Sequence, residues 1–200
     1  MEDRVVVTGL GICAPNGVTL NDFANSLKKG ISGISFQQKL KDLNFGCQVA
    51  GIPDINEGYV NRYFTPLQLR GLNASGLVYG VIAGTDAWTD AGLTKAQEDE
   101  PDWDSGIIFG TGILGVDKFR ESIHLVDAGN TRRLGSTSVI QTMASGISAY
   151  LGGILGSGNQ VTTNSSACTT GTEGVITVSY THLRAHETER LISYAVFCLK

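Results

Sequence analysis

Cys168 lies in a sequence context that favours nucleophilic chemistry. The run at 160–164 is typical of a short strand, the small residues at 165–167 allow a sharp turn, and 169–174 can open a helix. A thiol at a helix N-terminus faces unpaired backbone N–H groups and the positive end of the helix dipole, and both favour the reactive thiolate. The same N–H groups can stabilise the oxyanion of a thioester under attack. Spacing alone nevertheless favours a simpler alternative, in which Cys168 is a small buried apolar residue.

Two glycine-rich turns compete with this interpretation, because each fits a dinucleotide-binding pattern. Residues 9–14 (GLGICA) fit GxGxxA and residues 110–115 (GTGILG) fit GxGxxG. In a dinucleotide site the helix begins inside the motif and holds the pyrophosphate at its N-terminus. The first motif runs into the turn Pro15-Asn16-Gly17. The second lacks an acidic residue about 20 positions further on. A nucleotide-binding module therefore stays an alternative, but a weak one.

Other catalytic and metal-binding patterns are weaker still. A serine hydrolase at Ser165 or Ser166 would need GxSxG, which is absent, and a base, for which 1–176 offers only His124. The four cysteines show no metal-ligand spacing, and the pair His182 and His186 lies near the C-terminus. We expect no metal and no cofactor.

Composition narrows the choice of partners and compartment. The net charge of −4 and the pI of about 5.3 argue against nucleic-acid binding, which usually needs a basic stripe. No apolar run is long enough to cross a membrane. The N-terminus enters a strand-like run without a signal peptide, so the expected location is the cytoplasm.

The elements expected around Cys168 alternate between strands and helices. Strands are predicted at 4–8, 106–109 and 160–164, with brief candidates at 34–36 and 48–52. Helices are predicted at 20–29, from Pro66, and at 73–91, 116–126, 138–151 and after Cys168. The resulting order, β-α-α-β-α-α-β-α, indicates an α/β fold with a mostly parallel sheet.

Local signals mark several of these helix ends. Thr19 or Asn21 can cap the helix at 20–29, and Gly30 ends it. Thr65 before Pro66 is a favourable start, because proline fits the first helical position. Gly92 ends the longer helix.

Four stretches, in order, resemble the N-terminal half of a β-ketoacyl-[acyl-carrier-protein] synthase of the thiolase-like superfamily. These stretches are RVVVTGLGICAPNG at 4–17, DAWTDAGL at 86–93, GIIFGTGILG at 106–115 and SSACTTG at 165–171. The resemblance implies a thiolase-like fold and makes Cys168 the acyl-accepting nucleophile. It also implies an acyltransferase that condenses a Cys168-bound acyl group with a malonyl thioester, releasing CO2, in fatty-acid or polyketide synthesis.

The same resemblance sets expectations about partners and completeness. It implies an acyl carrier protein with acyl and malonyl thioesters as partners, and a homodimer. The family docks its carrier with basic residues before the long early helix, where this chain offers only Arg70, with Arg62 upstream. The family's catalytic histidines and lysine, from its C-terminal half, have no counterpart here. We therefore expect that the chain as written does not condense, and a non-catalytic truncated relative stays an alternative.

The resemblance stops near the C-terminus. Residues 178–188 (VSYTHLRAHET) and 192–199 (ISYAVFCL) resemble two parts of a translated sequencing-library adapter, in the correct order. We therefore predict an incomplete β-ketoacyl synthase N-terminal domain at 1–176 and an artefactual tail at 177–200, which is excluded from fold reasoning.

Overall fold

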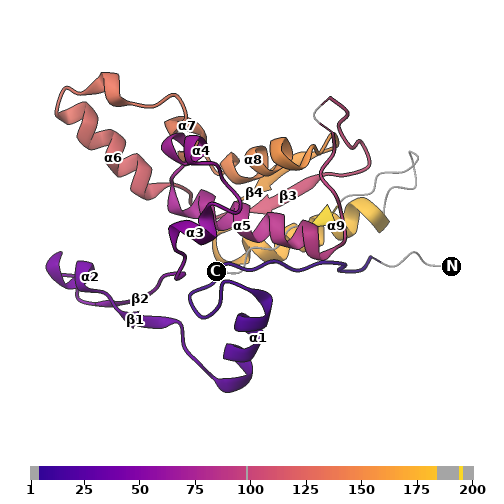
Figure 1. Cartoon of the computed structure of the whole chain (residues 1–200), viewed down its shortest axis with the longest axis horizontal. Helices are drawn as coiled ribbons and strands as arrows, with labels where there is room; N and C mark the ends of the chain where they lie inside the picture. The colour runs from indigo at the N-terminus through magenta and orange to yellow at the C-terminus, as the bar shows by residue number, and fades with distance from the viewer. Residues whose placement is uncertain (1–4, 98, 184–193, 196–200) are drawn as a thin grey trace.

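A parallel sheet lies at the centre of the computed structural model, which describes residues 5–97, 99–183 and 194–195 (Figure 1). Its strand order is β4 (Val161–Asn164), β3 (Ile107–Gly110), β5 (Tyr194–Ala195). β3 pairs with β4 in a register that runs from Ile107 opposite Val161 to Gly110 opposite Asn164. Parallel strands need a long crossover, and helices supply it here. The predicted α/β class with a parallel sheet is confirmed.

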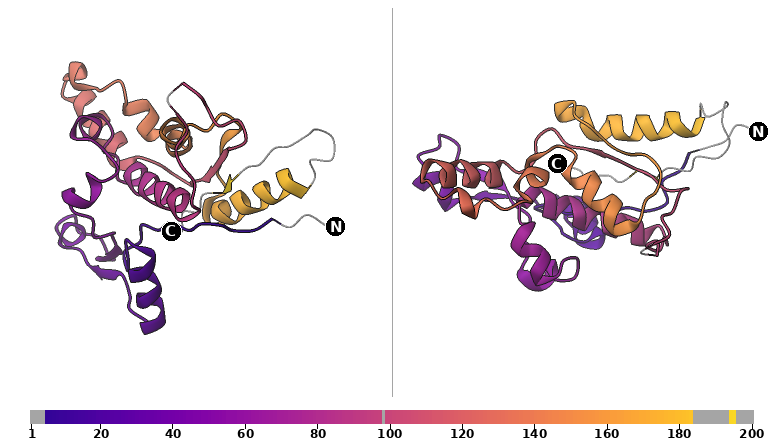
Figure 2. Two further views of the ribbon diagram at one scale, coloured as in Figure 1. Left: turned by 45° about the vertical axis from the view of Figure 1, so that its right-hand side comes forward. Right: turned by 90° about the horizontal axis from the view of Figure 1, so that it is seen from above.

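Helices cover both faces of this sheet. The crossover from β3 to β4 contains α6 (Val116–Asp127), η1 (Thr131–Arg133), α7 (Ser138–Thr142) and α8 (Gly146–Leu155). After β4 come the short turn η2 (Ala167–Thr169) and α9 (Thr170–Leu183). Figure 2 shows α9 on one side of the strands, with α8 and α5 on the other. Ile107, Ile108 and Phe109 of β3 are consequently all buried, as expected for a strand covered on both faces.

The long helix α5 (Ser75–Asp90) forms the core with α8. Its side chains Leu77, Val81 and Ile82 are fully buried. Close packing requires a glycine at one point: a Cβ on Gly80 would lie 2.8 Å from side-chain atoms of Ile147 in α8. Gly92, with φ +74°, follows the helix end as predicted.

An arm projects away from this core (Figure 1) and consists of α1 (Leu20–Lys29), β1 (Ile34–Phe36), α2 (Gln38–Asp42) and β2 (Val49–Gly51). β1 and β2 form an antiparallel pair. α1 has the predicted bounds: the side chain of Thr19 accepts a hydrogen bond from Asp22 N (3.2 Å), and Gly30 ends the helix at φ +65°.

Two short helices link the arm to α5, namely α3 (Glu57–Val60) and α4 (Pro66–Gly71). The predicted start at Thr65 is confirmed as a capping box. Gln68 N donates to Thr65 Oγ1 (3.2 Å), while Thr65 N donates to Gln68 Oε1 (2.8 Å).

The strand predicted at 4–8 is wrong over its described part, residues 5–8, since Arg4 lies outside the described residues. Val6 and Val7 are 71% and 62% exposed and belong to no strand. The residues that follow it, 9–11, lie against α5. Leu10 N donates to Asp90 Oδ2 (2.9 Å), and a Cβ on Gly11 would overlap the carbonyl of Ala83. A β-branched run forms a strand only where a partner strand meets it, and within the described residues no strand pairs with 5–8.

The single helix predicted at 138–151 is broken into α7 and α8. Met143 adopts an extended conformation (ψ 139°), which ends α7. The break leaves Gln141 facing inward, where it is fully buried. Its Nε2 donates to Gly71 O (2.7 Å), and its Oε1 accepts from Asn73 N (2.7 Å) and Ala74 N (2.8 Å). The periodicity of the sequence could not indicate these tertiary hydrogen bonds, and so it did not predict the break between α7 and α8.

Within the described residues, no helix is both long and apolar enough to traverse a membrane.

Candidate active site

Cys168 lies in a sharp turn between β4 and α9, at the carboxyl end of the sheet. We call residues 165–170 the Cys168 turn. The predicted order of strand, turn and helix is confirmed, with η2 carrying the cysteine and α9 starting two residues later. The side chain is exposed, so the alternative of a buried apolar cysteine is wrong. A thiol at this position is open to a substrate and lies at the N-terminal end of a helix, where backbone N–H groups lack helical partners.

Ala167, the residue before the cysteine, has a left-handed backbone with φ +52°. This conformation is unfavourable for residues with a Cβ and persists only where neighbouring groups hold it. Nothing in the sequence indicates it, because glycine and asparagine are the usual residues there. It allows the chain to reverse direction between β4 and α9 over very few residues.

Two threonines after the cysteine supply the groups that hold the turn. Thr170 Oγ1 donates to Ala167 O (2.6 Å) and accepts from Ser166 N (3.0 Å), and this residue is only 4% exposed. Thr169 Oγ1 donates to Ser166 O (2.8 Å). Short hydroxyl side chains that bond to nearby backbone are typical of turns. This tendency is the one signal by which the sequence could have revealed the role of the two threonines.

The turn is also attached to the two neighbouring strands. Asn164, at the end of β4, donates from Nδ2 to Thr170 O (3.0 Å), and its carbonyl accepts from Thr111 N (3.2 Å). Ser165 Oγ donates to Gly112 O (3.5 Å). The glycine turn at 110–115 therefore lies beside the Cys168 turn, at the same edge of the sheet.

That proximity explains the second glycine motif without a nucleotide. A Cβ on Gly110 would overlap Thr170, so the glycine is needed for close packing. α6 begins only at Val116, after the motif, and Gly115 precedes it at φ +62°. A dinucleotide motif requires the helix to start within it. The geometry of this turn does not fit that requirement.

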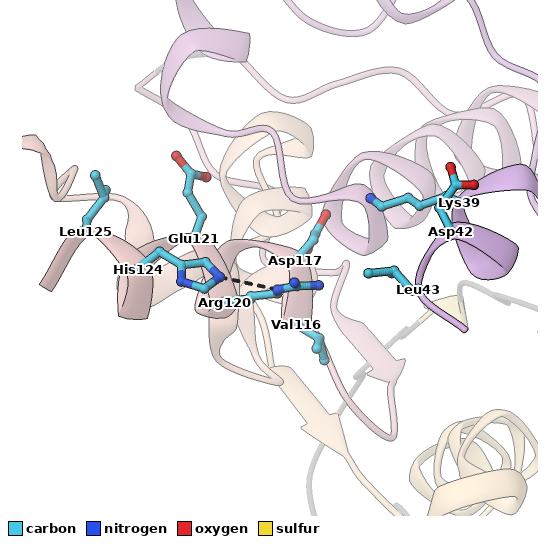
Figure 3. A pocket seen from close by; sticks show the side chains of 9 residues that line it. All are labelled: Lys39, Asp42, Leu43, Val116, Asp117, Arg120, Glu121, His124 and Leu125. Atoms are coloured by element: carbon cyan, nitrogen blue, oxygen red, sulfur yellow. Dashed lines mark hydrogen bonds between the residues drawn. The ribbon is translucent and has the colours of Figure 1, made fainter. Parts of the chain in front are cut away.

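A surface groove of about 770 Å³ lies between α2 and α6, and Figure 3 shows its lining. Lys39 and Asp42 come from α2, and Arg120 and His124 from α6. Arg120 Nε donates to His124 Nε2 (3.4 Å), and His124 is exposed. Cys168 does not line this groove. The histidine and the cysteine are thus not brought together as a catalytic pair.

An acid and a phenol with raised pKa values, Asp86 and Tyr63, also lie away from Cys168, in a cluster between α3 and α5. Tyr63 Oη donates to Asp86 Oδ1 (2.8 Å), and Tyr59 Oη donates to Val18 O (2.8 Å). The guanidinium of Arg62 lies 5.0 Å from the centre of the Tyr59 ring. Burial raises the pKa of both Asp86 and Tyr63. This cluster ties the arm to the core.

Comparison with known proteins gives consistent results in sequence and structure. The family "Beta-ketoacyl synthase, N-terminal domain" matches residues 2–196. The 3-oxoacyl-[acyl-carrier-protein] synthase 1 of Buchnera aphidicola subsp. Schizaphis graminum is 33% identical over 159 residues, which cover 74% of this chain and 36% of that protein.

Two solved structures share the fold at lower identity. The ishigamide ketosynthase/chain length factor superposes with a TM-score of 0.77 at 22% identity, over 92% of this chain and 45% of that chain. AntDE:AntF, a type II polyketide synthase ketosynthase in complex with its acyl-carrier protein, gives 0.71 at 23% identity, over 92% and 43%. The chain thus spans less than half the length of these relatives.

Proposed function

The chain belongs to the β-ketoacyl synthase family, and from this premise we propose that Cys168 is the acyl-accepting nucleophile of a condensing enzyme. The observation that carries the proposal is the exposed thiol between β4 and α9. The Cys168 thiolate attacks the carbonyl carbon of an acyl thioester, and the carbon–sulfur bond to the carrier breaks. The carrier leaves as a thiolate and takes up the proton that the Cys168 thiol lost. The acyl group is then held on Cys168 as a new thioester.

In the second half of the proposed reaction, a malonyl thioester loses CO2 and its carbanion attacks the acyl-Cys168 carbonyl. The new carbon–carbon bond forms as the Cys168 thiolate leaves. This step must stabilise an enolate oxyanion. We assign that task to residues outside this chain, which covers 36% of its relative from Buchnera. By itself, the chain is therefore expected to accept an acyl group without condensing it.

The proposed substrates are acyl and malonyl thioesters carried by an acyl carrier protein, in fatty-acid or polyketide synthesis. The names of the relatives support this, because one is a 3-oxoacyl-[acyl-carrier-protein] synthase and another is a ketosynthase in complex with its acyl-carrier protein. We place the enzyme in the cytoplasm.

A homodimer is proposed as its assembled form. An apolar stripe on α6 supports this, formed by Val116, Phe119, Ile123 and Val126, all exposed. Positions three and four apart share one face of a helix, so these side chains form a continuous surface available to a second copy.

The test of the catalytic assignment is acylation by a short acyl thioester, read by mass spectrometry of each cysteine peptide. We expect the acyl group on Cys168 and its loss in Cys168→Ala. Cys47→Ala is the matched control, because Cys47 is also exposed but lies in the arm. Equal acylation of the two cysteines, or none at Cys168, would contradict the assignment and favour a non-catalytic relative.

We also propose that the native domain occupies residues 1–176 and that 177–200 is an artefactual tail. The support is the resemblance of two segments of the tail to adapter sequence. Two described parts of the structure fall in this tail, the end of α9 from Thr177 to Leu183 and β5 at Tyr194–Ala195. The rest of the tail, at 184–193 and 196–200, lies outside the described residues. The family match extends to residue 196, so the source DNA across codon 177 decides the boundary. A frame that continues into different residues is expected, and the printed tail in genomic DNA would overturn this proposal.

A further inference from the structure

We infer that Thr170 is a positioning residue, whose side-chain hydroxyl holds the Cys168 turn in the conformation that presents the thiol. The inference rests on the proposed function of Cys168 and adds a residue to it. Thr170 is buried and polar and lies two residues after the cysteine, and its hydroxyl has two hydrogen bonds within the turn.

The hydroxyl connects two peptide groups that lie just before the cysteine. It accepts from Ser166 N (3.0 Å) and donates to Ala167 O (2.6 Å), and the Thr170 backbone N–H also donates to Ala167 O. A hydroxyl has one proton to donate and lone pairs to accept, so it can serve both groups at once. The two bonds bracket Ala167 and thereby fix its φ of +52°.

Ala167 needs this support because of its side chain. A left-handed conformation is unfavourable for a residue with a Cβ, and neighbouring contacts must offset its cost. Without the hydroxyl, Ala167 can relax to an ordinary conformation. Because Ala167 directly precedes Cys168, such a change rotates the peptide that carries the thiol.

Thr170 is itself held from two sides. Its carbonyl accepts from Asn164 Nδ2 (3.0 Å), at the end of β4. Its methyl carbon and backbone lie against Gly110 at the end of β3, where a Cβ would overlap both. Contacts with the ends of β3 and β4 therefore fix the position of the Thr170 hydroxyl. Its two hydrogen bonds then hold the Cys168 turn relative to these strands. Thr170 does not need to touch substrate to have this effect.

The test compares rate constants for modification of Cys168 in the full chain. Thr170→Val removes the hydroxyl and keeps the size, and we expect acylation by the acyl thioester to slow by about tenfold, since small misplacements of reacting groups have effects of this order or larger. Thr170→Ser keeps the hydroxyl and is expected to remain within about twofold of the native rate. The matched control is Thr89→Val, because Thr89 Oγ1 donates to Thr85 O (2.9 Å) within α5, outside the Cys168 turn.

A purely structural role predicts a different pattern. Thr170→Val and Thr170→Ser would then lower the melting temperature and the rate together, whereas positioning predicts rescue by serine in a folded protein. If Thr170→Val does not fold, Thr170→Ala replaces it as the variant without a hydroxyl. An acylation rate equal to that of the native chain in folded Thr170→Val would overturn the inference. So would a loss of rate in Thr170→Ser as large as that in Thr170→Val.

A second probe separates this inference from the proposed function. If the native chain is not acylated at Cys168, the catalytic assignment fails. The positioning of the thiol is then measured with iodoacetamide, as the ratio of Cys168 to Cys47 alkylation in the same molecule. Thr170→Val is expected to change this ratio at least threefold and Thr170→Ser to leave it unchanged. An unchanged ratio in valine would contradict the inference independently.

Discussion

Ala167 and Cys168 illustrate how one residue's backbone can determine another's accessibility. The left-handed φ of Ala167 turns the chain sharply enough to leave the next side chain exposed at the end of β4. The cysteine could be identified from the small residues before it and the helix after it. The left-handed alanine could not, because nothing in the sequence marks it. For the Thr170 hydroxyl the sequence offers only the general tendency of threonine to bond to nearby backbone in turns.

Asp86 gives a pH dependence at the scale of a single residue. Burial raises its pKa above the unfolded value of 3.8, and the Tyr63 hydrogen bond and the Arg62 charge partly oppose this. A carboxyl with a raised folded-state pKa stabilises the fold fully below its unfolded pKa, and this contribution is lost as the pH rises through the folded pKa. Asp86→Asn does not titrate, so we expect its stability relative to the native chain to increase from about pH 4 to about pH 7.

Urea unfolding of both proteins across that pH range measures this difference. Tyr63→Phe removes one of the interactions that lower the Asp86 pKa, so its stability should fall more steeply with rising pH than that of the native chain. A relative stability of Asp86→Asn that is flat or decreases with pH would contradict the assignment of the raised pKa to Asp86.

At the scale of elements, Gln141 joins α7 to the start of α5. Gln141→Leu keeps the side chain's approximate size but leaves the N–H groups of Asn73 and Ala74 without their acceptor. Buried groups that lose their partners cost about 1–3 kcal/mol each, so we expect a loss of about 3 kcal/mol in the free energy of unfolding. Gln38→Leu is the control: Gln38 is exposed, and a change within about 0.5 kcal/mol is expected. Equal effects of the two substitutions in urea titrations would show that the Gln141 bonds contribute little.

The same scale explains which elements the sequence predicts well. α1 and the start of α4 are determined by local caps, at Thr19, Gly30 and Thr65, and their predicted ends agree with the structure. The run at 5–8 and the helix at 138–151 depend on distant partners. The first has no partner strand among the described residues, and the second breaks so that Gln141 can reach the segment at 71–74. Periodicity describes a single element and contains no information on its neighbours.

At the scale of the whole molecule, the apolar stripe on α6 predicts self-association. Figure 1 shows α6 extending away from the sheet, and Phe119 on it is 58% exposed. We expect the sedimentation coefficient of the chain to rise with concentration, because exposed contiguous apolar surface favours association. Phe119→Lys is expected to weaken this. Leu67→Lys is the control, since Leu67 is an exposed apolar residue on α4. A monomer at every concentration, or equal weakening by both variants, would contradict a role for α6.

The parallel pairing of β3 with β4 has a consequence for the order of events in folding. The paired residues Ile107 and Val161 are 54 positions apart in the chain. Closing so long a loop is slow, because the crossover helices have to become compact before the two strands can pair and stabilise the fold. The Cys168 turn depends on both strand ends, so a newly made chain acquires its presented thiol only after this late step. During synthesis, the cysteine leaves the ribosome as an ordinary thiol and becomes a positioned one afterwards.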